Sequence, residues 1–249
     1  MQQWKKKIQS GHATLLVLLL VCMSFAFIRP EPAAGKKTTV AAVAIASPGP
    51  AAEKMALYDS LDLDDKGLSR KAFEYALAGY NRLLNSGRIA KDNLLSILDF
   101  SLPSGKKRLF VIDLESGQLV YNTYAAHGRN SGMAMATKFS NKANSYKSSL
   151  GFYITGETYT GKHGESLRLL GEERGFNDNA LARGIVMHSA AYADEDIVER
   201  QGFIGRSQGC PALPQNISKN IINTIKEGSC LFLYGPDEYY ISHSKLING

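Results

Sequence analysis

The sequence contains few cysteines and histidines, the residues that most often bind zinc. It contains three cysteines, and Cys210 and Cys230 lie in different contexts that do not suggest a zinc site. The histidines also lack the spacing of zinc ligands. Residues 62–67 are rich in aspartate, but the glutamate that completes a calcium loop is missing at the required position. We therefore expect neither a metal nor any other cofactor.

The sequence also lacks a hydrophobic run as long as most transmembrane helices. The apolar run at residues 13–28 has about 16 residues, against the roughly 20 that a spanning helix needs. Lys5 to Lys7 precede it, and residues 24–26 match a small-x-small cleavage site. Residues 1–29 are therefore predicted to be a signal peptide or, alternatively, a retained membrane anchor. In both cases the remainder is expected in the bacterial cell envelope, in the periplasm or outside the cytoplasmic membrane.

A basic excess is absent from the part of the chain that is expected to fold. The formal net charge is +6, but residues 1–37 hold six basic side chains and one acidic one, so the remainder carries about +1. Nucleic acid is therefore not an expected partner. The hydrophobic fraction of 44% and the charged fraction of 21% are typical of a globular protein.

The composition changes twice before residue 105. Residues 30–54 are rich in alanine, proline and glycine, which predicts a flexible linker. Residues 55–104 are predicted to form a helical N-terminal segment. Ser69 is the expected N-cap of a helix that ends at Gly87, because apolar residues repeat at helical spacing between them. A second helix is predicted from Asp92 onward, where four apolar residues follow closely.

From residue 107 the pattern predicts strands. A hairpin is expected around residues 109–124, with its turn at residues 115–118. Further strands are predicted at 152–155, 166–170, 185–188 and 229–234, and a helix at 215–227 with isoleucines on its buried face. The fold class is therefore α+β and predominantly β, and residues 105–249 are the predicted catalytic domain.

Cys210 is the strongest candidate for a catalytic residue. It follows Gly209 and precedes Pro211, so the turn allows a close approach of a ligand to the backbone. This layout suits a thiol nucleophile with N–H donors nearby. A thiol at neutral pH needs an activating base, and His188, at the end of an apolar run, is the candidate. Cys230 lies in an apolar run and is expected to be a core thiol.

Several segments between residues 105 and 235 resemble the murein L,D-transpeptidase catalytic domain, in a variant branch of the YkuD-like family. The matching segments are residues 127–132, 139–141, 149–151, 156–164, 187–188 and 205–214. The resemblance implies a curved β-sandwich with the site at one edge. It departs from the common pattern at Gln208, where a histidine is usual, and at Ala212, where an arginine is usual. The variant branch shares both departures, which leave the use of the acceptor in doubt.

The resemblance also implies roles for residues around the thiol. The backbone carbonyl of Ser189 would hold the tautomer of His188, so no third carboxylate is needed. The N–H groups of Gly209 and Cys210 would stabilise an oxyanion, and Ser207 and Gln208 would shape the same loop. Candidate substrate-binding residues are those with polar side chains in the two matching loops: Arg206, His127, Arg129 and Asn130.

The predicted function is cysteine-dependent acyl transfer on peptidoglycan peptide stems, which cross-links the bacterial cell wall through a Cys210 acyl-enzyme. Two alternatives remain at this point. The same site would act as an L,D-carboxypeptidase or endopeptidase if water replaced the acceptor amine. A non-catalytic cell-wall-binding module would keep the fold without the reaction, although the presence of both Cys210 and His188 argues against it.

Overall fold

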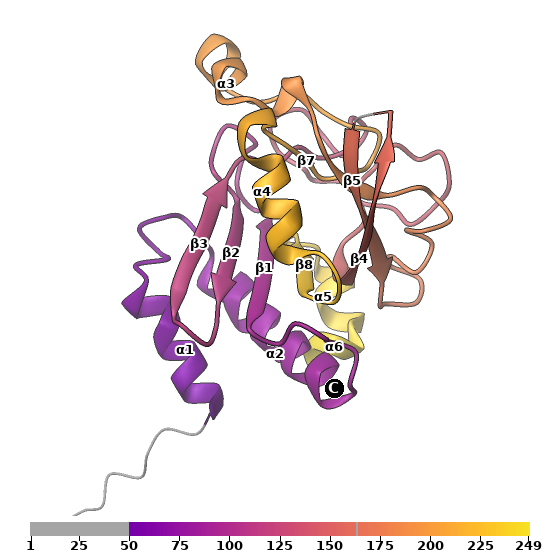
Figure 1. Ribbon diagram of the computed structural model, residues 1–249. Helices are drawn as coiled ribbons and strands as arrows, with labels where there is room; N and C mark the ends of the chain where they lie inside the picture. The colour runs from indigo at the N-terminus through magenta and orange to yellow at the C-terminus, as the bar shows by residue number, and fades with distance from the viewer. Residues whose placement is uncertain (1–49, 163) are drawn as a thin grey trace, which may run out of the picture. The chain divides into compact units, whose positions relative to one another are not determined.

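An eight-stranded sheet organises the described part of the molecule (Figure 1). The computed structural model describes residues 50–162 and 164–249, which belong to one compact unit. The predicted signal peptide or anchor, and most of the predicted linker, lie outside these residues. No helix within the described ranges combines the length and the hydrophobicity needed to cross a membrane.

The sheet is mixed and nearly closed. Its spatial order is β3-β2-β1-β8-β4-β5-β6-β7, in which β1 and β8 are parallel, β6 and β7 are parallel, and the other pairs are antiparallel. The strands span β1 Leu94–Asp99, β2 Leu109–Asp113, β3 Gln118–Thr123, β4 Gly151–Gly161, β5 Gly164–Gly171, β6 Val186–Ser189, β7 Ala212–Leu213 and β8 Cys230–Tyr234. Beyond β3, Ala126 pairs with Ala212 of β7 and Gly128 pairs with Ser207. These two bridges bring the edges of the sheet together beside Cys210.

The predicted helix from Asp92 is wrong. The same residues form β1, which pairs with β2 on one side and with β8 on the other, and all six of its residues are buried. A strand that is covered on both faces has no polar alternation, so its apolar run imitates a short helix in the sequence. Residues 55–104 are therefore not a purely helical segment, because they contribute a central strand to the sheet.

Two helices cover opposite faces of this sheet (Figure 1). Helix α2, Arg70–Asn85, begins at the predicted cap, where the Ser69 hydroxyl accepts from Ala72 N–H at 3.3 Å. The Ser69 N–H also donates to Asp99 at the end of β1, at 3.1 Å. Helix α4, Gln215–Ile225, packs against β5 and β6, and its Ile221, Ile222 and Ile225 are buried. Both helices confirm the helical periodicity of the sequence.

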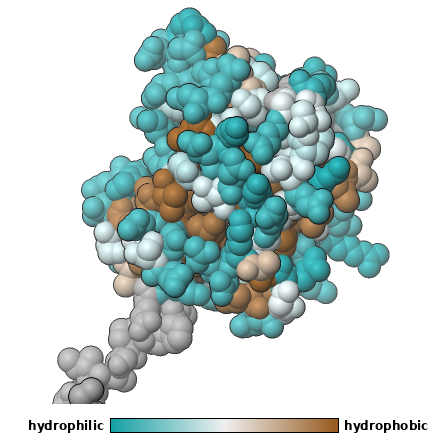
Figure 2. All heavy atoms as spheres, viewed as in Figure 1, coloured by the Kyte–Doolittle hydropathy of each residue, from teal (hydrophilic) through white to brown (hydrophobic). Residues whose placement is uncertain are grey.

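The remaining elements complete a predominantly β fold with helices, as predicted. The hairpin β2–β3 and the strands β4, β5, β6 and β8 confirm the strand pattern. Helix α1, Pro50–Ser60, begins inside the predicted linker, so the helical part starts earlier than expected. Short elements that local patterns did not predict are η1 Ala191–Ala193, α3 Glu195–Gln201, α5 Glu238–His243 and α6 Lys245–Asn248. Hydrophilic residues cover most of the face shown in Figure 2, while the apolar side chains of the strands are buried.

Candidate active site

The Ser207–Cys210 turn is stabilised by hydrogen bonds of the Ser207 hydroxyl and requires glycine at position 209. The Ser207 hydroxyl donates to the Cys210 carbonyl at 2.6 Å and accepts from the Gly209 N–H at 3.0 Å. Gly209 has φ +127°, and an added Cβ would lie 2.9 Å from the Lys147 carbonyl oxygen and 3.0 Å from Ile185 Cδ1. Only glycine fits this position without strain. The Gly209 N–H is bonded to Ser207, so in this conformation it does not serve as the predicted oxyanion donor.

The Cys210 thiol lies against the backbone just before β6. The Val186 N–H points to Sγ at 3.4 Å, and Sγ lies 3.7 Å from the Gly184 carbonyl oxygen. Burial raises the pKa of the Cys210 thiol above its ordinary value, while the Val186 N–H, Arg183 and Lys162 act in the opposite direction. The burial effect is the largest, so the thiol is mainly protonated at neutral pH. An acyl transfer at this site therefore requires a base to remove the proton.

His188 lies beside the cysteine because β6 and β7 are parallel neighbours. It pairs with Ala212, and its N–H donates to the Pro211 carbonyl at 3.3 Å. Its Nδ1 lies 2.8 Å from the Ser189 carbonyl oxygen. Because a carbonyl only accepts, Nδ1 donates its proton in this contact, and in the neutral form of the imidazole the lone pair therefore lies on Nε2. The neutral imidazole is thus oriented as the resemblance implied, through the backbone of Ser189 rather than through a carboxylate.

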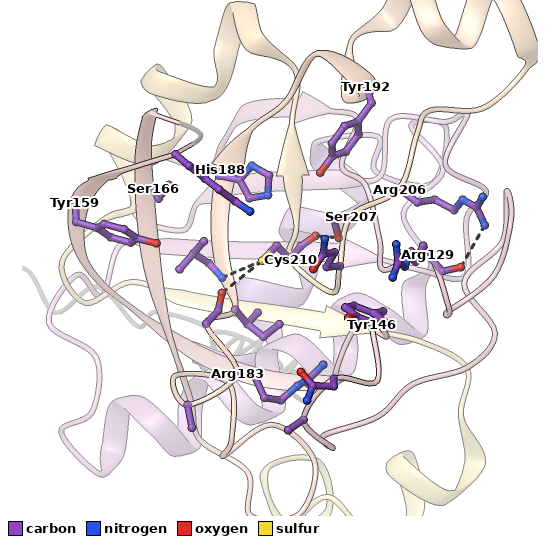
Figure 3. Close-up of a pocket in the computed structure, with 18 residues that line it drawn as sticks. Arg129, Tyr146, Tyr159, Ser166, Arg183, His188, Tyr192, Arg206, Ser207 and Cys210 are labelled. Atoms are coloured by element: carbon purple, nitrogen blue, oxygen red, sulfur yellow. Dashed lines mark hydrogen bonds between the residues drawn. The ribbon is translucent and has the colours of Figure 1, made fainter.

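Cys210 and His188 line one pocket of about 480 Å³ (Figure 3). Four basic residues also line it: Arg129, Lys162, Arg183 and Arg206. No aspartate or glutamate among the described residues takes part in the lining. A concave surface with charges of one sign concentrates ligands of the opposite sign. The pocket therefore favours a substrate that carries carboxylates.

Comparison with known families identifies the fold. The family description of the L,D-transpeptidase catalytic domain matches residues 64–234. The chain belongs to this family. The match begins well before residue 105, in agreement with the central position of β1 in the sheet. None of the curated protein sequences compared with this chain matches it.

Solved structures that resemble this L,D-transpeptidase domain share little sequence with it. An L,D-transpeptidase from Mycobacterium smegmatis is 15% identical over 57% of this chain and 59% of its own, with a TM-score of 0.36. An L,D-transpeptidase from Mycobacterium tuberculosis H37Rv is 15% identical over 57% and 58%, with a TM-score of 0.38. The helical cell shape determining protein Pgp2 from Campylobacter jejuni is 12% identical over 66% and 57%, with a TM-score of 0.38. The matches thus span less than two thirds of these chains.

The predicted substrate-binding residues of the domain separate into two groups. Arg129 and Arg206 line the pocket, and the Arg129 guanidinium lies 4.1 Å from the centre of the Tyr146 ring. Arg206 also donates to the Arg129 and Gly132 carbonyls, both at 3.2 Å, and so joins the two loops. The Asn130 amide donates to the Ser145 carbonyl at 2.9 Å and lies outside the pocket lining.

The prediction that His127 contacts substrate is wrong. Its side chain is fully buried, and its Nδ1 lies 2.7 Å from Nη2 of Arg108, which is buried as well. Arg108 donates in addition to the carbonyls of Ala125 and Leu102. The His127 carbonyl accepts from the Ser207 N–H at 2.9 Å. His127 therefore supports the Ser207–Cys210 turn from inside the protein.

His127 should make the stability of the domain depend on pH. Burial, followed by the Arg108 charge, lowers the pKa of His127 from 6.5 to about 4. Between these values the unfolded chain binds more protons, so the contribution of His127 to stability is present above pH 6.5 and is lost as pH falls through 4. In His127→Gln, this dependence should disappear. The free energy of unfolding of the wild type relative to this variant should fall by on the order of 3 kcal/mol between pH 7 and pH 4.

Urea unfolding of both proteins at each pH measures this difference. Burial also raises the pKa values of Asp99 and Glu173, which act in the opposite direction, but both residues are present in both proteins and cancel in the comparison. A difference that stays constant with pH would show that the pKa of His127 is not lowered in the folded state.

Two residues that local patterns did not single out lie in the pocket beside the thiol. Tyr192 follows β6 in η1, and its phenol points into the pocket in Figure 3. Burial, and next the negative charge that Cys210 carries as a thiolate, raise the pKa of Tyr192 to about 12, so the hydroxyl remains a donor. The second residue is Arg183, whose guanidinium bonds only to residues more than 30 positions away in the sequence. Nothing in the local sequence signals such contacts.

The described residues contain no group of three or more histidine, cysteine, aspartate or glutamate side chains arranged to hold a metal. The pocket itself presents a thiol, an imidazole and several hydrogen-bond donors.

Proposed function

We propose that this protein is a cysteine-dependent acyltransferase that acts on peptidoglycan peptide stems, as an L,D-transpeptidase. The observation that carries the proposal is the placement of Cys210 and His188 in one pocket, with the imidazole tautomer fixed by the Ser189 carbonyl. Membership of the L,D-transpeptidase catalytic domain family supports the substrate class. Since peptidoglycan lies outside the cytoplasm, we also propose a cell-envelope location, with export or membrane attachment through residues 1–29.

The first half of the reaction forms an acyl-enzyme. His188 Nε2 takes the proton of the Cys210 thiol, and Sγ attacks the carbonyl carbon between the L-centre of the third stem residue and the terminal D-residue. The oxygen becomes an oxyanion, for which the Cys210 N–H and the Tyr192 hydroxyl are the proposed donors. When the C–N bond breaks, His188 gives its proton to the departing amine. A thioester remains on Cys210.

The second half transfers the acyl group. The amine of a neighbouring stem attacks the thioester carbon, His188 takes a proton from that amine, and the thiolate leaves and is reprotonated. An amide between two third-position residues results. Water in place of the amine gives hydrolysis, which is the carboxypeptidase or endopeptidase alternative.

The arginines of the pocket should contribute to substrate binding. Arg129 is exposed and lines the pocket, so a stem carboxylate can reach its guanidinium. Arg129→Gln should raise KM about 3- to 10-fold with little change in kcat, as expected for loss of one exposed ion pair. The KM of the wild type should also rise with salt, and less so in the variant.

Arg200→Gln is the matched control for Arg129→Gln. Arg200 is an exposed arginine of α3 that pairs with Asp196 and lies outside the pocket lining. An equal increase of KM in both variants would contradict a role of Arg129 in binding.

Incubation of the full chain with purified tetrapeptide-stem peptidoglycan fragments tests the proposed function. Mass spectrometry should show cross-linked dimers whose mass equals that of two stems minus one free D-amino acid, which is released from the donor stem. Loss of the terminal residue without dimers would establish the hydrolase alternative instead. Binding of peptidoglycan without any product would favour the non-catalytic wall-binding module.

A further inference from the structure

Arg183 connects a long loop to the wall of the active-site pocket. Its Nη1 donates to the Ser140 carbonyl at 2.8 Å and to the Ser149 hydroxyl. Its Nη2 donates to the Ser145 hydroxyl at 3.1 Å and to the Lys147 carbonyl at 2.7 Å. All four acceptors belong to residues 140–149, here called the 140–149 loop. The planar guanidinium thus gathers a loop that contains no regular secondary structure.

The 140–149 loop also contacts the Ser207–Cys210 turn. The Ser148 hydroxyl donates to the Gly209 carbonyl at 3.2 Å and accepts from the Gly128 N–H at 3.1 Å. A Cβ added to Gly209 would lie 2.9 Å from the Lys147 carbonyl oxygen and 3.4 Å from Nη2 of Arg183. The guanidinium therefore lies directly against the backbone that carries the cysteine.

Arg183 also precedes the backbone segment that contacts the thiol. The next residue, Gly184, presents the carbonyl that faces Cys210 Sγ, and Val186 presents the N–H. Arg183, Gly184 and Val186 all line the pocket, in which Figure 3 labels Arg183 and Cys210. The Arg183 side chain thus fixes residues 184–186, whose backbone contacts Sγ, relative to the Ser207–Cys210 turn.

The positive charge of Arg183 is not balanced by a carboxylate. Its four acceptors are carbonyl and hydroxyl oxygens, and it forms no salt bridge with an aspartate or glutamate of the described residues. The side chain is partly buried, so solvent screens its charge less than that of an exposed arginine. An unbalanced cation beside a thiol favours the thiolate.

The groups that face the thiol support this assignment. Arg183 and Lys162 lower the pKa of Cys210, against the larger effect of burial. His188 and Tyr192 line the same pocket, as do the more peripheral Arg129 and Arg206. Among these groups, Arg183 alone is held by four hydrogen bonds to the 140–149 loop.

We propose that Arg183 is the positioning residue of the nucleophile: its guanidinium fixes the 140–149 loop against the Cys210 turn and keeps a positive charge beside the thiolate. The role in turnover rests on the proposed transpeptidase function. The role toward the thiol does not, because it concerns the ionisation of Cys210 alone.

The rate of Cys210 alkylation by iodoacetamide as a function of pH tests the proposal. The reagent is neutral, so its approach does not depend on the charge of Arg183. The measurement uses the full chain and follows the Cys210 peptide by mass spectrometry, which separates it from Cys22 and from the buried Cys230. Arg183→Gln should slow alkylation at pH 8 by about 3- to 10-fold and move the midpoint to higher pH. Arg200→Gln should give the wild-type profile.

Arg183→Lys separates charge from geometry. Lysine keeps the positive charge but cannot make four hydrogen bonds in one plane. Its alkylation profile should therefore lie close to that of the wild type, while its kcat on peptidoglycan stems stays reduced. Equal slowing of alkylation in the Lys and Gln variants would overturn the charge role. A wild-type kcat in the Lys variant would overturn the role of the four hydrogen bonds from the Arg183 guanidinium to the 140–149 loop.

The two proposals fail in different ways. A wild-type protein that turns over peptidoglycan stems, together with an Arg183→Gln profile that superimposes on the wild-type profile, overturns the role of Arg183 and leaves the function intact. A wild-type protein without turnover, together with a shifted Arg183→Gln profile, overturns the proposed function and leaves the assignment of Arg183 to the thiol intact.

Discussion

Replacing Cys210 by alanine is expected to abolish both turnover and the acyl-enzyme. The proposed reaction forms its thioester on Sγ, and no other described cysteine lines the pocket. The rate of stem cross-linking should fall by at least about 10³-fold, as for the loss of other catalytic nucleophiles. Cys210→Ser should behave almost the same way, because a hydroxyl is a much weaker nucleophile with this base. Acid-quenched samples analysed by mass spectrometry should show the stem adduct on the wild type but not on Cys210→Ala.

Cys230→Ala is the matched control for loss of a thiol. Cys230 is fully buried in β8, far from solvent, and burial raises its pKa well above the ordinary range, so it is inert. The control variant should lose some stability but keep both the adduct and turnover. Cross-linking that persists in Cys210→Ala would contradict the mechanism and favour a different nucleophile or a binding module.

Loss of His188 should have the second-largest effect. His188→Gln removes the base that takes the thiol proton, and general acid–base catalysis of this kind contributes about 10²- to 10⁴-fold. Because the pKa of Cys210 is raised, few thiolates remain at neutral pH without the base. The residual kcat/KM should therefore increase about tenfold per pH unit, until pH reaches the pKa of the thiol. Steady-state rates between pH 6 and pH 10 measure this slope.

Ser189→Ala is the control for the histidine. The contact of Ser189 with His188 uses its backbone carbonyl, which alanine retains. Ser189→Ala should therefore keep at least half of the wild-type activity and the wild-type pH profile. A large loss in this variant would indicate that the hydroxyl, rather than the carbonyl, orients the imidazole.

The candidate site could be predicted from the sequence only in part. Cys210 and His188 were found because a turn-forming glycine and a buried strand leave clear local patterns beside them. The same reasoning failed at His127, where a polar residue in a matching loop suggested substrate contact. Its burial depends on Arg108, 19 residues away, whose guanidinium occupies the interior. Burial of a polar side chain is decided by partners that no local pattern reveals.

Local patterns predict the helices that cover the sheet but not its central strand β1. Ser69 and the isoleucines of 217–225 predicted α2 and α4 correctly, because caps and one-sided burial are local features. The residues of β1 predict a helix in the sequence, because a strand that is buried at all six residues between two neighbouring strands shows no regular polar alternation. Its position beside β8, more than 130 residues later, is a nonlocal fact.

The sequence alone determined the strand-rich fold class and the helices with one buried face, and it predicted Cys210 and His188 as the candidate nucleophile and base. These features depend on residue types at short spacing, which set backbone conformation and chemical reactivity. The tertiary structure alone decided the near closure of the sheet, the burial of His127, and the placement of Arg183 and Tyr192 in the pocket with Cys210. Those features arise when segments that are distant in the sequence pack together, and the burial that they create raises the pKa of the thiol while nearby positive charges act in the opposite direction.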